Sequence, residues 1–507
     1  MDRNRIFNNK YFLSLDLSLI SILLLFILFG IILIPYYQFQ INPDGIVYLN
    51  IAKIYFSGNV YSAIDPYHSP LISWLLVPFF IFGSNPVYLL FSTKILSLII
   101  GFFTIIGIRQ LSYNFEMNNN IRNAILFAFI PILLYFTYSV ITPDLLMVCL
   151  LVYYLNIIYS SKYAEKLSYG LICGFIGTIA YFAKSYAFPF FIVHFALFNF
   201  LHYFKNIEYR RKVLKNLILG FLVFFVVSGV WIGAISHKEG KITYSTAAEF
   251  NHNLVGPDSS KVWTTQYLGD SPVYIQPWSA FDSWYTFKYQ LNLIFKNTIQ
   301  TIDIFTLFSY FSILILLIYL LIFIKPIKKI LKDDRIYPFL TIIIFSAGYT
   351  IVLLEERYLW LVYILLFLMG GYLTNLFFKN KLFTNTRKIL VLLILIVSFV
   401  FMPISSLSAN INADKDVYIL ANEIEMQHDI YGNIAANTND NKMIYLAYYL
   451  NANYSGQTKP ETTQTDLIKY NIDFYFVWNN KNNIYSQYKE IAIENREALK
   501  IYSIKHF

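Results

Sequence analysis

Apolar residues in this chain are gathered into long, nearly uninterrupted runs that are separated by polar segments. An α-helix needs about 20 mostly apolar residues to cross about 30 Å of hydrocarbon, and eleven of the runs come close to this length. The pattern therefore predicts about eleven transmembrane helices. They are placed at residues 17–34, 87–108, 124–141, 143–160, 167–183, 186–204, 213–235, 302–324, 337–354, 358–378 and 388–407.

The connection between the first two predicted spans, residues 36–86, is expected to hold two helices that lie on the membrane. Asn42-Pro43-Asp44 indicates a helix start, because asparagine is a favoured N-cap and proline is favoured at the first helical position. The residues that follow alternate in the manner of an amphipathic interfacial helix. Residues 71–82 are apolar but too short to span, so they are predicted to form a second interfacial or re-entrant piece.

Two further polar segments are long enough to fold. Residues 236–301 are rich in small polar residues and in aromatics, which favours a loop that folds over a site. Residues 408–507 contain short strand-like and helix-like stretches and are predicted to form a small α/β domain. The sequence thus divides into an all-α polytopic membrane domain, residues 1–407, and an α/β domain, residues 408–507.

The composition supports this division. The chain of 507 residues is 57% hydrophobic, 19% aromatic and only 14% charged, which excludes the soluble globular and the disordered classes. Cys149 and Cys173 both lie in apolar runs and indicate neither a disulfide framework nor a metal motif.

The net charge of +9 is distributed very unevenly. If the N-terminus is cytoplasmic, the short inside connections hold clusters of lysine and arginine. Outside connections of similar length hold one basic residue or none, as the positive-inside rule requires. The charge therefore reflects membrane topology and not a nucleic-acid partner. An odd number of spans then places the tail 408–507 outside the cytoplasm, in an integral protein of the cell membrane.

Ionisable residues near the outer ends of the spans need an explanation, because charges in a bilayer are costly unless they are paired, at an interface or in a cavity. They are Asp44, Asp65, His68, Lys94, Asp144, Lys184, Glu355, Glu356 and Arg357.

Asp44 and Asp144 follow the same local pattern, since each comes directly after a capping residue and a proline. Each carboxylate then complements the dipole of the helix that it starts. Two such carboxylates on one face also suggest a pair in a cleft, where one of them takes a proton from a hydroxyl as general base. The helix N-terminus opposes this second role, because it lowers the pKa of a carboxylate. The sequence leaves both interpretations open.

Four cationic or titratable residues are candidates for binding a phosphate. Lys184 lies between two spans with almost no loop, so it either reaches the interface along its apolar stem or points at an anion in a covered cavity. Lys94 lies about 10 Å inside its predicted span, where reaching the interface is strained. Arg357 either forms ion pairs with the two glutamates before it or binds a phosphate in fork geometry. His68 is solvated, donates to a phosphate, or joins the two aspartates around a metal.

These residues lie in motifs that resemble the GT-C superfamily of integral-membrane glycosyltransferases. The similarity is to bacterial and archaeal enzymes of the protein O-mannosyltransferase and lipid A aminoarabinose transferase group. The motifs are Pro43-Asp44-Gly45-Ile46-Val47-Tyr48-Leu49, His68-Ser69-Pro70-Leu71-Ile72-Ser73-Trp74, Thr142-Pro143-Asp144, Thr178-Ile179-Ala180-Tyr181-Phe182-Ala183-Lys184 and Glu356-Arg357-Tyr358.

The resemblance implies an inverting hexosyl- or pentosyltransferase that uses a polyprenyl-phosphate (dolichyl-type) sugar and a lipid, glycan or protein acceptor on the outer face. Asp44 would be the general base, and Asp144 would assist it or position the acceptor or a metal. Lys184 and Arg357, with Lys94 and His68 as further candidates, would bind the donor phosphate. A divalent metal is possible, held by Asp44, Asp144 or His68.

One position departs from the family, and two other functions stay open. The mannosyltransferases carry an acidic residue directly after the loop aspartate, whereas this chain has Gly45. That difference argues against assigning mannose or a protein acceptor. The alternatives are a flippase or transporter for lipid-linked sugars, whose essential charges would lie at mid-bilayer depth, and an envelope oligosaccharide polymerase or ligase that uses a diphosphate-linked donor.

Overall fold

The structure of the chain is a computed structural model. The predicted cytoplasmic tail 1–15 and parts of the segments 236–301 and 408–507 lie outside the residues that it describes. The described residues are 16–257, 267–268, 277–324, 333–379, 383–438, 440–460, 463–479, 487–491 and 499–504.

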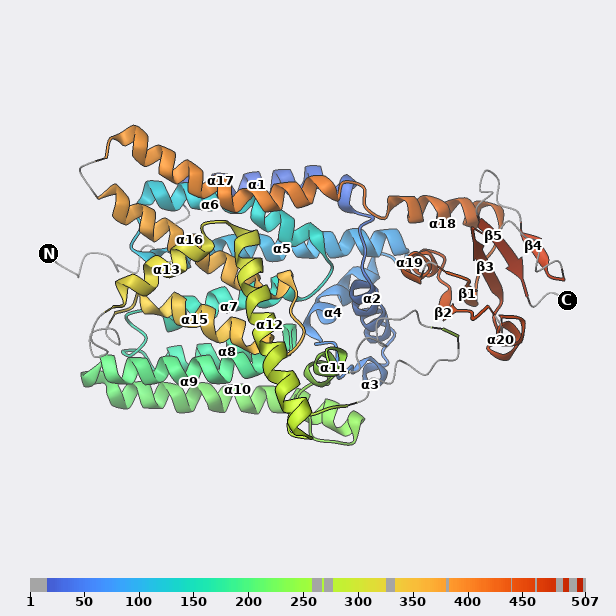
Figure 1. The fold of residues 1–507 in the computed structure, drawn as a ribbon, viewed down its shortest axis with the longest axis horizontal. Helices are drawn as coiled ribbons and strands as arrows, with labels where there is room; N and C mark the ends of the chain where they lie inside the picture. The colour runs from blue at the N-terminus through green and yellow to red at the C-terminus, as the bar shows by residue number, and fades with distance from the viewer. Residues whose placement is uncertain are drawn as a thin grey trace.

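Seven helices in the described part of the chain are long and apolar enough to cross a membrane. An eighth span arises if α12 (Trp284–Phe308) and α13 (Ser312–Ile322), which are bent by 108° at a short break, cross together. Figure 1 shows α12 running across the other helices. The seven spans are formed by α1 (Leu17–Tyr37), α5 (Pro86–Leu111), α6 (Asn119–Ser139), α9 (Ala187–Lys205), α10 (Arg210–Glu239), α16 (Trp360–Phe378) and α17 (Asn385–Ala409).

All eleven predicted positions hold helical residues. The predicted span 302–324 is divided between the end of α12 and the 11-residue α13, and three other helices are short. They are α7 (Asp144–Ile158), α8 (Ser168–Ala183) and α15 (Ile336–Thr350), with 15, 16 and 15 residues. At about 1.5 Å per residue they are about 22–24 Å long, less than the hydrocarbon thickness of about 30 Å. Among the described residues, seven or eight of the predicted spans are thus long enough to cross by themselves, and the other three positions hold shorter apolar helices.

A layer of short helices covers one end of the bundle, as predicted for residues 36–86. α2 (Pro43–Phe56) begins with proline at the first helical position and Asn42 at the N-cap. The predicted piece 71–82 is formed by α4 (Leu71–Leu76) and the 3-10 helix η3 (Val77–Ile81), after the single turn α3 (Val60–Ala63).

A fifth short helix, α11 (Ala247–Leu254), comes from the predicted covering loop. It is fastened to the first loop by two hydrogen bonds to the carbonyl of Pro66. The Thr246 N–H donates over 2.9 Å and the Ser245 hydroxyl over 3.1 Å. The two segments thus form one cover over this end of the bundle.

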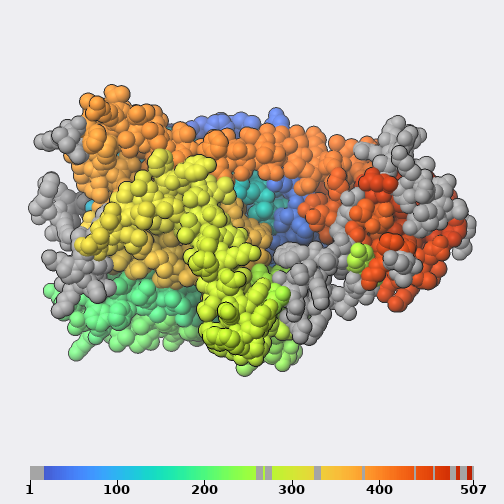
Figure 2. Space-filling view, viewed as in Figure 1, coloured from blue at the N-terminus to red at the C-terminus, as the bar shows by residue number. Residues whose placement is uncertain are grey.

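The C-terminal region forms the predicted α/β domain, which appears as a lobe at one end of the bundle in Figure 2. β1 pairs in parallel with β2 and β3, β3 pairs antiparallel with β5, and the sheet order is β2-β1-β3-β5-β4. The elements are α18 (Lys415–Gln427), β1 (Asn433–Ala436), α19 (Asp440–Tyr449), β2 (Asn453–Gln457), α20 (Thr463–Lys469), β3 (Phe474–Trp478), β4 (Lys489–Ile491) and β5 (Leu499–Ser503).

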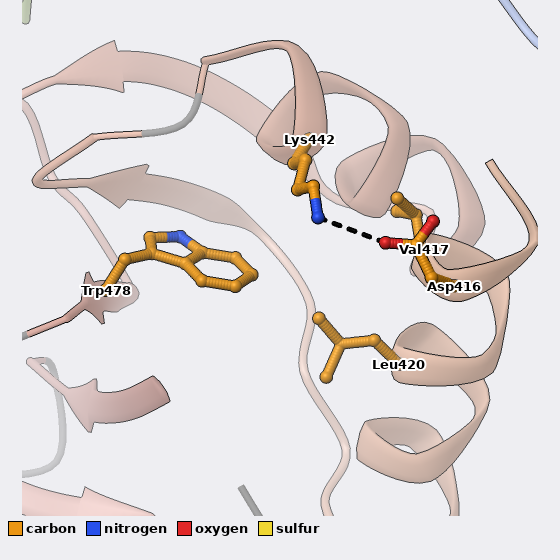
Figure 3. A pocket seen from close by; sticks show the side chains of 5 residues that line it. All are labelled: Asp416, Val417, Leu420, Lys442 and Trp478. Atoms are coloured by element: carbon orange, nitrogen blue, oxygen red, sulfur yellow. Dashed lines mark hydrogen bonds and ion pairs between the residues drawn. The ribbon is translucent and has the colours of Figure 1, made fainter. Parts of the chain in front are cut away.

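A small hollow lies on this domain between α18, α19 and the end of β3 (Figure 3). Its volume is about 60 Å³, and its wall includes Trp478, Leu420 and Val417. The two charged groups at its rim already pair with each other, because the Lys442 Nζ lies 3.0 Å from the Asp416 Oδ2. The hollow is therefore a minor feature of the domain surface.

The α/β domain is attached to the end of the bundle that carries α2. The Tyr448 hydroxyl donates to the carbonyl of Pro86 over 3.0 Å, and the Tyr449 hydroxyl donates to the carbonyl of Phe39 over 3.4 Å. The Ile41 N–H donates to Asp414 over 3.2 Å. These contacts define the domain-side end of the bundle, where the polar residues singled out above also gather.

Candidate active site

Four helix ends bring the predicted acidic and basic residues together. Asp44 lies in the first turn of α2, and Asp144 is the first residue of α7. Lys184 directly follows α8, and Arg357 lies in the 3-10 helix η7 (Glu356–Leu359) ahead of α16. The three short helices α7, α8 and α15 thus each have one end at the site.

The two carboxylates and two cations form one cluster. The Lys184 Nζ donates to the Asp144 Oδ1. The Arg357 guanidinium contacts both aspartates, with its Nη2 3.2 Å from the Asp44 Oδ2 and its Nε 3.9 Å from the Asp144 Oδ2. The same Nε lies 2.6 Å from the Glu355 Oε2. Aspartates a hundred positions apart in the sequence therefore meet across a single guanidinium, as the sequence patterns predict.

The two aspartates differ in how far their side chains are exposed to solvent. The Asp144 side chain is 2% exposed, whereas that of Asp44 is 44% exposed. Arg357 and Lys184 lie between these extremes, at 16% and 19%. Asp44 is thus the carboxylate that a molecule from outside can reach, and Asp144 is held within the protein by the cations.

Local sequence explains how Asp144 is fixed. The Thr142 hydroxyl donates to the Asp144 Oδ2 over 2.7 Å, and Pro143 occupies the N-cap position of α7. A carboxylate in the first turn also gains from the positive end of the helix dipole. The helix dipole and the neighbouring cations therefore both act on the Asp144 carboxylate. Asp144 can complement its helix dipole and also be one of a pair of carboxylates.

The segment that leads to Arg357 is held by side-chain amides from α12. The Asn297 Nδ2 donates to two carbonyls, those of Thr350 over 3.0 Å and Val352 over 2.7 Å. Gln290 and Gln300, on the same helix, donate to the carbonyls of residues 351 and 354. Residues 351–355, between α15 and η7, have no helix of their own, so these amides bind backbone carbonyls that a helix would otherwise satisfy.

Aromatic rings line the cationic side of the cluster. The Lys184 Nζ lies 3.7 Å from the centroid of the Tyr358 ring. Tyr349 stacks on Tyr358 with centroids 4.9 Å apart and on Tyr186 at 3.7 Å. A cation over an aromatic face is stabilised by the ring quadrupole. The sequence analysis missed these contacts, although Tyr358 directly follows Arg357 in one of the quoted motifs.

Tyr67 is a further member that the sequence analysis did not single out. Burial, followed by the negative charge of Asp44, raises the pKa of Tyr67 to about 12. Its hydroxyl donates to Asn251 of α11 over 3.5 Å. Tyr67 thus stays neutral at ordinary pH and connects the covering helix to the neighbourhood of Asp44.

Two predicted phosphate-binding residues have their contacts elsewhere. The His68 Nδ1 lies 3.4 Å from the Asp65 Oδ2, and its ring packs edge-on against Tyr48 and Tyr67. Lys94 is 1% exposed, and its Nζ donates to the carbonyl of Tyr138 over 3.4 Å. The structure thus brings Asp44, Asp144, Lys184 and Arg357 together and gives His68 and Lys94 other partners.

The possible metal site does not fit the residues that are present. Among the described residues, there is no group of three or more histidine, cysteine or acidic side chains that could hold a metal ion. Asp44 and Asp144 both contact Arg357, and His68 contacts Asp65. The carboxylates of the cluster thus have lysine and arginine as partners in place of a metal ion.

Close packing around α2 explains why glycine, and not an acidic residue, follows Asp44. A Cβ at this position would lie 2.7 Å from the Cβ of Ile141, so α2 packs on the connection ahead of α7 without room for a side chain. We expect Gly45→Ala to lower the free energy of unfolding by about 1–3 kcal/mol and to lower any activity of the site.

The matched control for Gly45→Ala is Gly229→Ala in α10, where a Cβ would meet nothing within 4 Å. This change should leave stability unchanged or slightly higher, because alanine favours a helix. Thermal unfolding of both variants in detergent checks the prediction. An equal response at the two positions would contradict it.

The polytopic helical domain, the covering layer between the first two spans and the terminal α/β domain together form a fold that is similar to that of solved GT-C membrane enzymes. Solved structures agree. The chain is similar to ArnT from Cupriavidus metallidurans bound to undecaprenyl phosphate, with a TM-score of 0.58, 11% identity and coverage of 96% of this chain and 98% of ArnT. The apo state of that ArnT gives a TM-score of 0.55 and 10% identity over the same shares.

An oligosaccharyltransferase from Archaeoglobus fulgidus, tethered with an acceptor peptide, matches with a TM-score of 0.45 and 9% identity over 91% of this chain and 69% of that one. No protein-family model and no curated protein sequence matches the chain. The two ArnT structures therefore confirm the predicted fold class.

Proposed function

We propose that this protein is an inverting glycosyltransferase that moves a sugar from a polyprenyl-phosphate donor to an acceptor hydroxyl on the outer face of the membrane. The observation that carries the proposal is the contact of Arg357 with both aspartates. It places an accessible carboxylate, Asp44, beside Arg357, and joins it through Arg357 and Asp144 to a second cation, Lys184. A transfer from a lipid phosphate needs a base for the acceptor and positive charge for the leaving group.

In the proposed reaction, Asp44 takes the proton of the acceptor hydroxyl while the hydroxyl oxygen attacks the anomeric carbon. The bond between that carbon and the phosphate oxygen breaks, and the lipid phosphate leaves with the electron pair. Lys184 and Arg357 neutralise the charge that develops on the phosphate. A single displacement from the opposite side inverts the anomeric centre. Asp44 then returns its proton to water.

Asp144 has a different part in this proposal. With 2% exposure it is closed to an acceptor, but it holds the Lys184 ammonium and lies 3.9 Å from Arg357. A buried carboxylate that pairs with two cations fixes their positions before the donor binds, which is the arrangement that favours electrostatic stabilisation of a leaving group. We therefore assign Asp144 as a positioning residue.

The location of the cluster favours a transferase over a transporter. Asp144, Lys184 and Arg357 lie at helix ends under the cover formed by α2 and α11, whereas essential charges of a transporter are expected near the middle of the bilayer. ArnT, of similar fold, was crystallised with undecaprenyl phosphate, which supports a monophosphate donor for this chain over a diphosphate one.

The test is a transfer assay with the purified protein in nanodiscs. Radiolabelled polyprenyl-phosphate sugars are supplied together with lipid, glycan or protein acceptors, and the products are separated by thin-layer chromatography. We expect the label to move from the donor to one acceptor fraction. If the label crosses the bilayer of proteoliposomes without leaving its lipid, the protein is a transporter and the proposal is wrong.

The pH dependence of donor use follows from Lys184. Burial lowers the pKa of Lys184 below the ordinary value of 10.5, and the charge of Asp144 opposes this only in part. Because the charged form binds phosphate, activity should fall as pH rises through this lowered pKa. Lys184→Arg keeps its charge to higher pH, so the alkaline limb of its kcat/KM profile should move upward. An unmoved limb would contradict the assignment of Lys184.

A further inference from the structure

Two side-chain amides join the connection before Asp44 to the connection before Asp144. The Gln40 Nε2 donates to the carbonyl of Ser139 over 3.0 Å. The Ile141 N–H donates to the Asn42 Oδ1 over 2.8 Å, and the Asn42 Nδ2 lies 3.5 Å from the carbonyl of the same residue. We call these contacts of Gln40 and Asn42 the amide clamp.

The extended backbone of both connections explains how the amide clamp forms. Asn42 is extended, with φ −145° and ψ 157°, and so is Val140, with φ −150° and ψ 153°. In extended chain, side chains two residues apart point to the same side. Gln40 therefore contacts Ser139 and Asn42 contacts Ile141 from the same side of the chain. The two segments are thus joined at two positions that lie two residues apart.

Asn42 gives up its usual role to form the clamp. An asparagine at an N-cap ordinarily accepts a hydrogen bond from the second or third N–H of its own helix. Here no side-chain cap bond is formed to α2, and the Asn42 Oδ1 accepts from Ile141 instead. Gly45 tightens the same contact, because α2 packs directly on Ile141. The residue that the sequence marks as a cap thus serves the neighbouring segment.

We propose that Asn42 and Gln40 are positioning residues that set the distance between the two carboxylates. Asn42 lies two residues before Asp44, and Ile141 lies three residues before Asp144, so the clamp fixes both helix starts against each other. This inference rests on the proposed function, because a fixed distance matters only if Asp44 must meet a substrate beside Arg357. It adds two residues outside the charge cluster to the set that the reaction depends on.

The spacing is expected to matter strongly. Arg357 contacts Asp44 at 3.2 Å and Asp144 at 3.9 Å, and a shift of α2 by about 1 Å would break one of these contacts. Misplacement of a reacting group by about 1 Å costs up to about 100-fold in rate. We therefore expect Asn42→Ala to lower kcat by about 10- to 100-fold and Gln40→Ala to lower it less, with the KM for the donor nearly unchanged.

The experiment compares Asn42→Ala and Gln40→Ala with the control Asn59→Ala in full-length protein in nanodiscs. Asn59 is an N-cap in the same loop, whose side chain accepts from the N–H of Ser62 in its own helix α3. Two readouts are taken per folded protein: kcat and KM with a radiolabelled polyprenyl-phosphate sugar, and hydrogen exchange of peptides that cover residues 139–147. Gln40→Ala keeps the test valid if Asn42→Ala fails to fold.

Support consists of lower kcat, unchanged KM and faster exchange at residues 139–147 in the clamp variants, and neither change in Asn59→Ala. Unchanged exchange in both clamp variants overturns the clamp itself. Faster exchange with wild-type kcat overturns the positioning role. If the wild-type protein transfers no sugar from any donor while the exchange still responds, the proposed function has failed and the clamp stands as a contact.

Discussion

Replacing Asp44 with asparagine is expected to lower kcat by about 10²–10⁴-fold and leave the protein folded in the membrane. Asparagine still accepts hydrogen bonds but cannot take a proton from an acceptor hydroxyl. The stability change should be small, at about 0–1 kcal/mol, because Asp44 is 44% exposed and its ion pair with Arg357 is open to solvent. The measurement is turnover with a radiolabelled polyprenyl-phosphate sugar, alongside thermal unfolding.

Glu355→Gln is the matched control for this prediction. Glu355 is 40% exposed and also pairs with Arg357, so its removal changes the charge around Arg357 by the same amount as the loss of Asp44. If Asp44 is the base, Glu355→Gln should reduce turnover by less than about 10-fold. Wild-type turnover in Asp44→Asn, or equal losses in both variants, would show that Asp44 is not the general base.

Replacing Lys184 with alanine is expected to abolish transfer and also to destabilise the protein. Asp144 is 2% exposed and would lose the ammonium that it contacts. Breaking a buried pair by removing one partner costs about 3–5 kcal/mol, since the remaining charge is left without compensation. The midpoint of thermal unfolding should therefore fall together with activity.

The double variant Lys184→Met with Asp144→Asn separates the two effects. It removes both charges, and buried ion pairs replaced by neutral groups of similar size are often no less stable. We expect it to recover most of the lost stability while transfer stays absent, because the cation for the phosphate is still missing. Recovery of transfer in this variant would show that Lys184 acts only by balancing Asp144.

The sequence predicted the meeting of the four charged residues because each lies at the end of an apolar run, and helix ends on one side of a membrane share one plane. Depth along a helix is readable from sequence in this way. Direction around the helix axis is not, and Lys94, which lies about 10 Å inside its span, donates to Tyr138 and not to the cluster. His68 likewise has the right place in the loop but turns towards Asp65.

The length of the spans was the larger difference. Hydropathy extended the predicted spans to residues 160 and 354, whereas α7 ends at Ile158 and α15 ends at Thr350. The pattern has no means to distinguish apolar residues inside a helix from apolar residues in a loop under a cover. Asn42 shows the same limit, since its sequence context indicates a cap and only the fold provides Ile141 as its partner.

The shortness of α7, α8 and α15 has a consequence for which nucleophile reaches the donor. The three helices fall about 6–8 Å short of a full crossing, and Asp144, Lys184 and Arg357 beside their ends are largely screened from solvent, at 2%, 19% and 16% exposure. In the proposed reaction, the carrier lipid brings its sugar to these partly buried charges, where little water has access. Wasteful hydrolysis of the activated sugar is thereby disfavoured relative to capture by a bound alcohol.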